Sequence, residues 1–397
     1  MPDPDRGRQR PGGGPAPTAP LRILLLAPAA SAHTRRWADD LVARGHTVSV
    51  CSWHDPGPRP AGWRVATAPA AGSWWPWRAV RAVGWLRREA RRARPDVIHV
   101  HSLGIHGAMS LALPARTAPR LITPWGSELR AANRHPGRTL VAWLALRRAA
   151  RVVPTSHEVA RHVERRYRIP RARITTLSWG VPDALLDAQN DTGPGPVRAR
   201  YGIPAGATVA LSIRSTAEVY RTHEIAAAFT RAARVRSDLF LVVLAGHRPA
   251  DAEARRAQHH YLARVRKRMA EQAGRAILIE QPLSHAEMFG LMRASHFAIS
   301  VPRSDQRSSS VLEAAAAGCR LLLSDIAPYR ELAADGLLTD PLHDPLEATL
   351  ADALTHAQPL TADDRRANRE LIGQTERGSV KIAQLERLYR DLARPST

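Results

Sequence analysis

The sequence predicts an α/β protein with two doubly wound, Rossmann-like domains that face each other across a cleft. Short apolar runs alternate with longer amphipathic segments. This alternation stops once, at a stretch rich in Pro, Gly, Asp and Asn (residues 182–206), and then restarts. Strands buried on both faces appear as continuous apolar runs, and helical crossovers between them produce parallel sheets. A chain of 397 residues is also long enough for two cores. Ligands of such folds bind at the carboxyl ends of the strands, so the site is expected between the domains.

The expected domain limits follow the composition. Residues 1–20 are rich in Pro, Gly and Arg, lack an apolar pattern and are expected to form a disordered leader. The run LRILLLA (21–27) superficially resembles the apolar part of a signal peptide, but an amphipathic helix follows at once, so we interpret it as the first strand. The other expected parts are a first domain (21–187), a linker (188–206), a second domain (207–372) and a C-terminal helix (373–397) that packs back toward the first domain.

Eleven apolar runs are the expected strands. Those of the first domain are residues 21–27, 47–53, 96–102, 120–126, 151–156 and 174–180. Those of the second domain are residues 209–214, 239–246, 276–281, 297–302 and 321–325, with helices expected at 222–235, 251–273 and 284–294. No stretch approaches the 18 or so continuous apolar residues of a membrane-spanning helix, so none is expected.

The net charge limits the classes of possible partner, and the two cysteines indicate the cellular compartment. The formal net charge is +22 and comes mostly from arginine. It reflects either the codon usage of a GC-rich genome or an anionic partner, such as a membrane surface or a phosphorylated substrate. No nucleic-acid recognition motif accompanies the charge, so no nucleic-acid partner is expected. Cys51 and Cys319 lie far apart and form no metal-ligand or CxxC pattern, which fits a reducing, cytoplasmic compartment and predicts no metal site.

The segment SDQRSSSVLEAAAAGC (304–319) has the features of an anion site at the start of a helix. We expect the helix to start near Ser309 or Ser310, with the amides of Ser310, Val311 and Leu312 pointing out of it. Such amides suit a diphosphate. Glu313 is expected within the first turn, where its carboxylate can accept hydrogen bonds from the vicinal hydroxyls of a ribose. The alternative is that Glu313 is merely a favourable acid near a helix start.

This segment resembles the donor site of retaining glycosyltransferase family 4, which has the GT-B fold. The hallmark is an acid, seven residues and a glutamate, followed by a helix of small residues and a glycine; here the two acids are Asp305 and Glu313. The resemblance extends over nearly the whole chain from about residue 21. It includes the segments SAHTRRWADDLVARGHTVSV, PDVIHVHSLG, LITPWGSEL, VVPTSHEVARHV, ITTLSWGVP and SIRSTAEVYRTHEIAAAF.

The resemblance implies which residues bind the donor. Arg214, at the end of a strand, matches the arginine that contacts the donor diphosphate, and a guanidinium can hold two phosphate oxygens at once. A lysine usually follows a few residues on; here Arg221 either replaces it or is an ordinary solvated arginine. Gln281 stands in the loop that contacts the nucleobase, where glycine is usual. The expected donor-binding residues are therefore Arg214, Arg221, Gln281, Ser309, Ser310, Val311, Leu312 and Glu313.

The resemblance also implies residues near the transferred sugar and the acceptor. Asp305, Glu313 and His101 are expected in catalytic positions, although His101 could equally be a packed histidine at a strand end. Trp125 stands where many relatives have histidine; it cannot act as an acid or base, but it can stack on a ring. The expected acceptor-side residues are Ser31, His33, Trp125 and Gly126.

The expected function is a retaining transfer of a sugar, hexosyltransferase-like, from a nucleotide sugar to an acceptor hydroxyl. The product would be a polysaccharide, glycolipid or other glycoconjugate. The Asp-x-Asp pair, Asp3 and Asp5, lies in the leader, so no metal or other cofactor is expected. In the family the leaving phosphate is thought to assist the acceptor, so no protein nucleophile is named. Two alternatives remain: a nucleotide-sugar epimerase of the same fold, and a non-catalytic sugar-binding or scaffolding relative.

Residues 73–95 combine tryptophans with many arginines. Trp74, Trp75 and Trp77 precede a helix whose apolar positions are expected to cover the sheet; these positions are Val80, Val83, Trp85, Leu86 and Ala90. Seven arginines accompany one acid, Glu89; they are Arg78, Arg81, Arg87, Arg88, Arg91, Arg92 and Arg94. Tryptophan favours the membrane interface, and basic side chains bind anionic lipids. We therefore expect peripheral association with the inner face of the cytoplasmic membrane, which would suit a lipid-linked acceptor.

Overall fold

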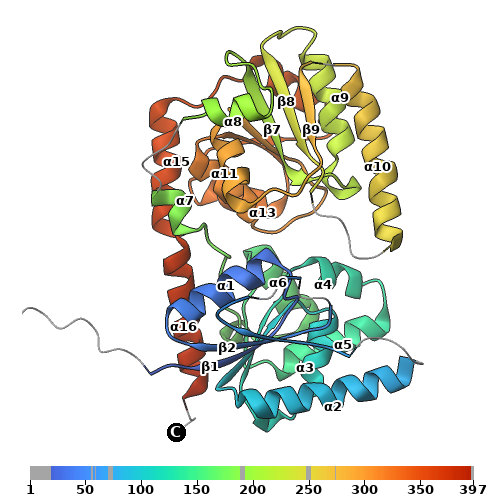
Figure 1. Ribbon diagram of the computed structural model, residues 1–397, viewed down its shortest axis with the longest axis vertical. Helices are drawn as coiled ribbons and strands as arrows, with labels where there is room; N and C mark the ends of the chain where they lie inside the picture. The colour runs from blue at the N-terminus through green and yellow to red at the C-terminus, as the bar shows by residue number, and fades with distance from the viewer. Residues whose placement is uncertain are drawn as a thin grey trace, which may run out of the picture.

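A computed structural model describes residues 19–54, 57–58, 60–69, 75–187, 193–246, 252–272 and 274–394. Most of the leader and Trp74 lie outside these residues. The described chain forms two lobes, each built on a six-stranded parallel sheet with helices on both faces (Figure 1). This is the GT-B arrangement of two Rossmann-like domains, and the predicted fold class is confirmed.

The first domain holds the sheet β3-β2-β1-β4-β5-β6. Its strands are β1 (Arg22–Leu26), β2 (Thr47–Ser52), β3 (Arg64–Thr67), β4 (Val97–His101), β5 (Arg120–Thr123) and β6 (Arg151–Val152). Its helices are α1 (Ala32–Ala43), α2 (Trp75–Ala93), α3 (Ile105–Leu111), α4 (Ser127–Ala132), α5 (Pro136–Arg148) and α6 (His157–Tyr167), with short 3-10 turns at Ala115–Thr117 and Arg171–Arg173.

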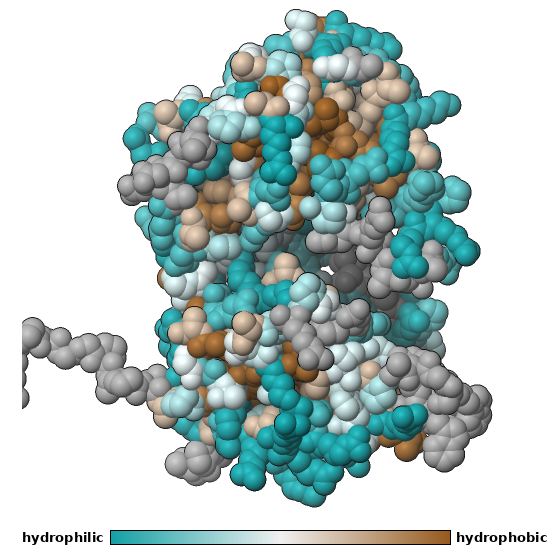
Figure 2. Space-filling model, viewed as in Figure 1, coloured by the Kyte–Doolittle hydropathy of each residue, from teal (hydrophilic) through white to brown (hydrophobic). Residues whose placement is uncertain are grey.

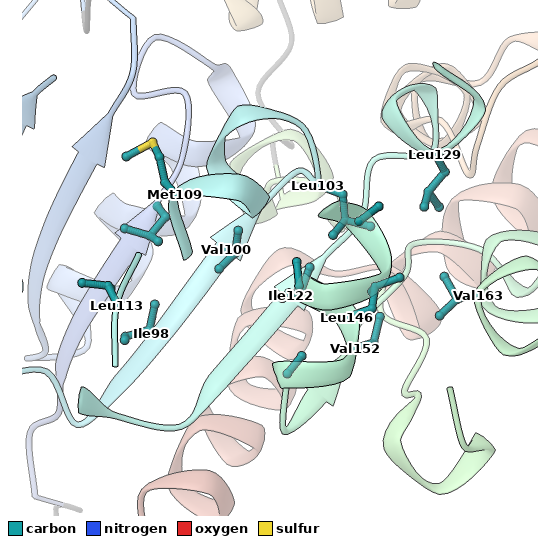
Figure 3. Packing of buried hydrophobic residues seen from close by; sticks show 14 of the residues in the cluster. Ile98, Val100, Leu103, Met109, Leu113, Ile122, Leu129, Leu146, Val152 and Val163 are labelled. Atoms are coloured by element: carbon teal, nitrogen blue, oxygen red, sulfur yellow. The ribbon is translucent and has the colours of Figure 1, made fainter. Parts of the chain in front are cut away.

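The apolar runs of the sequence form the core of this domain. The central strands β1 and β4 are almost completely buried, because helices cover the sheet on both sides. Figure 3 shows one face of the sheet, where side chains of β4 and β5 meet those of α3, α5 and α6. Burial of each such Leu, Ile or Val contributes about 1.5–3 kcal/mol before the entropy of ordering is subtracted.

The second domain holds the sheet β12-β11-β10-β7-β8-β9. Its strands are β7 (Thr208–Ser215), β8 (Leu239–Leu244), β9 (Ala276–Ile279), β10 (Phe297–Ser300), β11 (Arg320–Ser324) and β12 (Thr339–Leu342). Its helices are α7 (Asp183–Asp187), α8 (Gly195–Arg200), α9 (Thr222–Ala232), α10 (Ala252–Ala270), α11 (His285–Arg293), α12 (Ser309–Ala317), α13 (Ala327–Ala334), α14 (Leu346–His356) and α15 (Ala362–Thr375), with a 3-10 turn at Glu218–Tyr220.

The chain crosses between the domains twice, and the two crossings lie side by side. Val181 donates to the carbonyl of Glu376 at 2.6 Å and accepts from the amide of Gly378 at 2.7 Å. The last helix, α16 (Gly378–Ala393), then runs along the first domain, where it packs against α1 and β4 (Figure 1). Its buried Ile382, Leu385 and Tyr389 belong to the core on that face of the first sheet.

Three local features differ from the predicted elements. Residues 174–180 form no strand; Ile174 makes one isolated bridge to Val152, and the segment then continues to the crossing between the domains. Strands β3 and β12 were not predicted, because each has four residues, and neither has a continuous buried apolar run. Helix α8 lies in the stretch predicted as a linker and packs on α11.

Candidate functional site

A cavity of about 800 Å³ lies between the two domains. The first domain contributes the first turns of α1, where His33, Arg36 and Asp40 line the cavity. The second domain contributes the end of β7, the loop between β9 and α11, and the start of α12. The site thus lies at the carboxyl ends of parallel strands, as expected for a doubly wound fold.

Arg214, at the end of β7, is the best-placed cation of the second domain's wall. Its guanidinium donates to Ser308 Oγ at 2.6 Å, and it lies 3.3 Å from the carboxylate of Asp305. Burial lowers the pKa of Arg214, but the carboxylate of Asp305 and the hydroxyls of Tyr220 and Tyr329 together raise it, so that the pKa lies above its ordinary value. Asp305 also accepts a hydrogen bond from the buried hydroxyl of Tyr329 at 2.8 Å. Asp305 is not among the residues that line the cavity, so it supports Arg214 from behind.

Tyr220 is a second residue of this wall, and the sequence did not indicate it. It ends the 3-10 turn after β7 and lines the cavity. Its ring lies under the guanidinium of Arg214, 4.5 Å from ring centroid to carbon, and its hydroxyl accepts from Arg214 Nη2 at 2.9 Å. Stacking on an aromatic ring and a hydrogen bond together fix the orientation of the guanidinium.

The start of α12 forms part of the wall, and the helix begins at Ser309, as predicted. Ser308 is the N-cap, and its carbonyl accepts from the amides of Val311 and Leu312, both at 3.2 Å. Their amides are therefore not free, and neither residue lines the cavity, which disagrees with their predicted donor-binding position. Ser309 and Ser310 do line it, and among the described residues their amides have no acceptor. The small alanines and Gly318, with φ of +93°, complete and end the helix as predicted.

Glu313 lies in the second turn of α12, not in the first turn as predicted. It is 5% exposed and lines the cavity. Its Oε1 lies 2.9 Å from Nε2 of His285, the first residue of α11. The hydrogen bond to Glu313 raises the pKa of His285 despite partial burial. The sequence did not indicate His285, since nothing in a 28-residue separation shows that two helix starts converge.

The first domain's wall is aromatic and basic. The ring of His33 stacks on Trp179 at 4.6 Å between centroids. Burial, together with the positive charge of Arg36, lowers the pKa of His33 to about 3, so this imidazole is neutral at physiological pH. Arg36 donates to the carbonyls of Trp179 and Gly180 next to the domain crossing. The predicted position of His33 on the cleft therefore agrees with the cavity lining.

His101 does not line the cavity, which disagrees with its predicted catalytic position. It is completely buried, and its Nδ1 lies 3.3 Å from Thr34 Oγ1. Burial lowers the pKa of His101 to about 3. Its neighbour on β4, His99, is held between the hydroxyls of Tyr389 and Thr123. Both histidines are therefore packed behind the aromatic wall, which was the alternative reading of the sequence.

Trp125 and Gly126 contact protein groups at the domain boundary. Trp125 packs edge-on against His33, with 6.3 Å between ring centroids, and does not line the cavity. Gly126 has φ of +78°, and a Cβ atom there would lie 2.6 Å from Gln306 Nε2 of the second domain. Gln306 also accepts from Thr155 Oγ1 of the first domain. A close approach to the backbone was expected at Gly126, and the side chain of Gln306 makes it.

Of three further residues that were predicted to lie at the site, one lines the cavity and two do not. Gln281 lines the cavity as predicted. Arg221 does not, because its backbone is left-handed (φ of +54°) and its guanidinium pairs with Glu224 at 2.6 Å and Asp344 at 2.5 Å. Ser31 does not line it either, since it is the N-cap of α1. Arg221 therefore does not supply the missing second cation of the wall.

A comparison with known protein families finds one match, which lies in the first domain. Residues 30–185 match the family model described as Glycosyltransferase Family 4. The match covers most of the first domain, which is somewhat less than half of the chain. No curated protein sequence matches the chain.

Several solved structures share the fold at low sequence identity. Sucrose-phosphate synthase from Thermosynechococcus elongatus superposes with a TM-score of 0.77 at 15% identity, over 93% of this chain and 98% of that one. Anabaena HepE in complex with UDP gives 0.72 at 13% identity, over 93% and 99% of the two chains. A UDP-forming α,α-trehalose-phosphate synthase from Burkholderia xenovorans gives 0.70 at 13% identity, over 94% and 100%.

The solved structures show that the chain has the GT-B fold, and its first domain is similar to Glycosyltransferase Family 4. The predicted resemblance to this family is confirmed over residues 30–185, which match its model.

Proposed function

We propose that the protein transfers a sugar from a nucleotide sugar to an acceptor hydroxyl with retention of the anomeric configuration. The observation that carries this proposal is the second domain's wall. A stacked arginine, a helix start with free amides and a carboxylate line one side of a single cavity, namely Arg214, Ser309, Ser310 and Glu313. The cation and amides suit a diphosphate, and the carboxylate suits the hydroxyls of a ribose.

The proposed reaction breaks the bond between the anomeric carbon of the sugar and an oxygen of the outer phosphate. The acceptor oxygen bonds to the anomeric carbon on the same face, and the acceptor proton passes to the departing phosphate oxygen. No protein nucleophile takes part. Arg214 and the amides of Ser309 and Ser310 stabilise the charge that develops on the phosphate. They perform this role without a metal in the proposed mechanism.

The acceptor is proposed to bind against the first domain. His33 and Arg36 face the donor wall across the cavity. The neutral imidazole of His33 can accept or donate one hydrogen bond to a sugar hydroxyl without bringing a charge to the reacting centre. Stacking of His33 on Trp179 holds the ring in place for such a contact.

A panel of nucleotide sugars tests the proposed function. The unsubstituted protein should bind and slowly hydrolyse at least one of them, with UDP-sugars tried first because two structural neighbours are described with UDP. E313A should abolish turnover, while E347A, a substitution of an exposed glutamate outside the cavity, should leave it unchanged. Absence of binding and hydrolysis for every donor, with the fold intact by circular dichroism, would sink the proposal. Product analysis without an acceptor separates transfer from epimerisation.

We also propose that the first domain binds an anionic membrane surface, where a polysaccharide or glycolipid precursor would be the acceptor. No described helix meets the length and apolarity needed to cross a bilayer. Helix α2 lies at the end of the first domain that faces away from the second (Figure 1). Its arginines at 87, 88, 91 and 92 are exposed, and hydrophilic residues cover most of this end in Figure 2. Trp75 and Trp77 lie in α2, but their side chains are outside the described ones.

The charged surface of α2 continues onto α5. Arg87 donates to the carbonyl of Ala112 at 2.9 Å, and Arg148 of α5 donates to that of Leu111 at 3.2 Å, so both helices flank the end of α3. Helix α5 exposes Leu140 (55%) and Trp143 (37%). Exposed apolar side chains beside arginines are the combination that binds a membrane interface.

A further inference from the structure

Tyr220 is in a position to contact the donor directly. Its ring and hydroxyl are fixed on Arg214, and the residue lines the cavity between the domains. A guanidinium has donors and no acceptor, so the phenolic oxygen must accept from Arg214 Nη2. The hydrogen of the Tyr220 hydroxyl is therefore unused in this contact. Among the described residues the Tyr220 hydroxyl donates no hydrogen bond, which leaves its hydrogen free to point into the cavity.

Arg214 needs such a neighbour because protein groups already occupy several of its hydrogen-bond donors and pair with its charge. Its guanidinium already donates to Ser308 and to Tyr220 and is paired with Asp305. The positive charge of Arg214 is thus largely balanced by Asp305 before any phosphate binds. A diphosphate carries two or three negative charges and needs several donors at once.

The residues on either side of Tyr220 supply no second cation. Val219 is an apolar residue that is 42% exposed. Arg221 is held away from the cavity by Glu224 and Asp344. The phenolic hydroxyl is therefore the donor that this turn presents beside Arg214.

We propose that Tyr220 donates a hydrogen bond from its hydroxyl to the outer phosphate of the nucleoside diphosphate. This inference rests on the proposed function, because it assumes a nucleotide donor. Tyr220 keeps its proton throughout; it stabilises the negative charge that grows on the outer phosphate as the bond to the sugar breaks. A hydrogen bond aimed at developing charge accelerates the reaction without a change of protonation.

The first test compares UDP with UMP, which lacks the outer phosphate. In the unsubstituted protein UDP should bind more tightly than UMP. Y220F should weaken UDP binding about 15- to 100-fold, within the range for a hydrogen bond to a charged group, and leave UMP binding nearly unchanged. It should also lower kcat for hydrolysis of the UDP-sugar by more than it raises KM. Equal effects of Y220F on UDP and UMP, or no effect on either, would overturn the inference.

A double-mutant cycle separates direct contact from positioning of Arg214. R214K keeps the charge but removes the planar fork that meets the Tyr220 hydroxyl. If Tyr220 acts directly, Y220F still weakens UDP binding several-fold in the R214K background. If Tyr220 only orients Arg214, Y220F has no further effect there, and the inference is wrong.

Y201F provides the matched control. Tyr201 also lies in the second domain but does not line the cavity. Its hydroxyl is buried, and among the described residues it has no hydrogen-bond partner. Its removal should leave the ratio of UMP to UDP dissociation constants unchanged. Failure of the unsubstituted protein to bind UDP, ADP or GDP would refute the proposed function together with this inference. Binding that Y220F leaves intact would refute the inference alone.

Discussion

Nε2 of His285 lies 2.9 Å from Oε1 of Glu313, so the carboxylate assigned to the ribose hydroxyls has a titratable partner. The two residues come from the first turn of α11 and the second turn of α12, two helices that pack together. Glu313 is nearly buried, whereas the His285 side chain is 47% exposed on the cavity side. His285 therefore fixes the carboxylate while remaining open to solvent and substrate.

The first prediction concerns the pH dependence of this pair. Glu313 raises the pKa of His285 above its ordinary value of 6.5, so the folded state binds the proton more tightly than the unfolded state. The resulting stability is fully present below pH 6.5 and is lost as the pH rises through the folded-state pKa. H285Q should therefore lower Tm at pH 5.5 by about 1–3 °C more than at pH 8.5, because solvent around the half-exposed His285 screens the pair and keeps its contribution modest.

The control for this prediction uses the partner residue. E313Q should reproduce the same pH-dependent loss, and H285Q/E313Q should add little to either single substitution. NMR titration of the His285 ring should show its pKa falling in E313Q. An unchanged pKa in E313Q would mean that the pair does not form in solution.

The second prediction concerns histidines that are buried in neutral form. Burial lowers the pKa of His106 to about 3, and its Nε2 accepts from the amide of Trp53. The unfolded chain binds a proton at this histidine below about pH 6.5, but the folded chain does not. The free energy of unfolding should therefore fall as the pH drops below 6.5. Each such histidine contributes a loss of up to about 1.4 kcal/mol per pH unit.

H106Q should reduce the slope of unfolding free energy against pH between pH 6 and 4.5 by about one proton equivalent. Denaturant unfolding at several pH values measures this slope. H260Q, in which an exposed histidine of α10 is replaced, controls for the loss of an imidazole from the surface. A slope in H106Q equal to that of the unsubstituted protein would contradict the assignment of a neutral, buried His106.

The sequence predicted the parts of the site that lie within one continuous motif. Glu313 stands in an alanine-rich helix and could be located from the local pattern, whereas Arg214, at the end of a long apolar run, was assigned through the resemblance to the family. The free amides were predicted only in part, because with Ser308 as N-cap the amide of Ser310 is free but those of Val311 and Leu312 bond to the carbonyl of Ser308. Arg221 was misplaced because its guanidinium pairs with Glu224 and Asp344, from a residue whose backbone is left-handed, with φ of +54°. No local pattern encodes that angle in a non-glycine residue.

Contacts between segments distant in the sequence explain the remaining differences. His285 and Tyr220 were missed because each stands at the start or end of a short element in which polar residues are common. The resemblance to the family placed His101 at the cleft, but α1 covers it through Thr34 and Trp37. Strand ends predict the location of a site to within one turn, and only packing decides which side chain reaches it.

The third prediction tests the contact between Gly126 and Gln306. G126A places a Cβ atom in a left-handed conformation, which costs about 1–2 kcal/mol, and pushes Gln306 away from Thr155, which costs about 1 kcal/mol more. Denaturant unfolding should show the full loss in G126A. In the Q306A background, G126A should lower the free energy of unfolding only by the cost of the left-handed backbone at residue 126. Equal losses in both backgrounds would show that the two residues do not touch.

The last prediction tests the proposed membrane surface of the first domain. Each arginine near an anionic leaflet contributes about 1 kcal/mol, and this attraction weakens as salt shortens the Debye length. The protein should therefore sediment with vesicles containing anionic lipid at low salt and be released at high salt. R87Q/R88Q/R91Q/R92Q should weaken binding by more than tenfold. The matched control R256Q/R264Q/K267Q/R268Q removes four charges from exposed positions of α10 in the second domain and should bind as the unsubstituted protein does. Equal weakening by both quadruple substitutions would indicate that net charge alone attracts the protein, and an absence of binding at low salt would refute the membrane proposal.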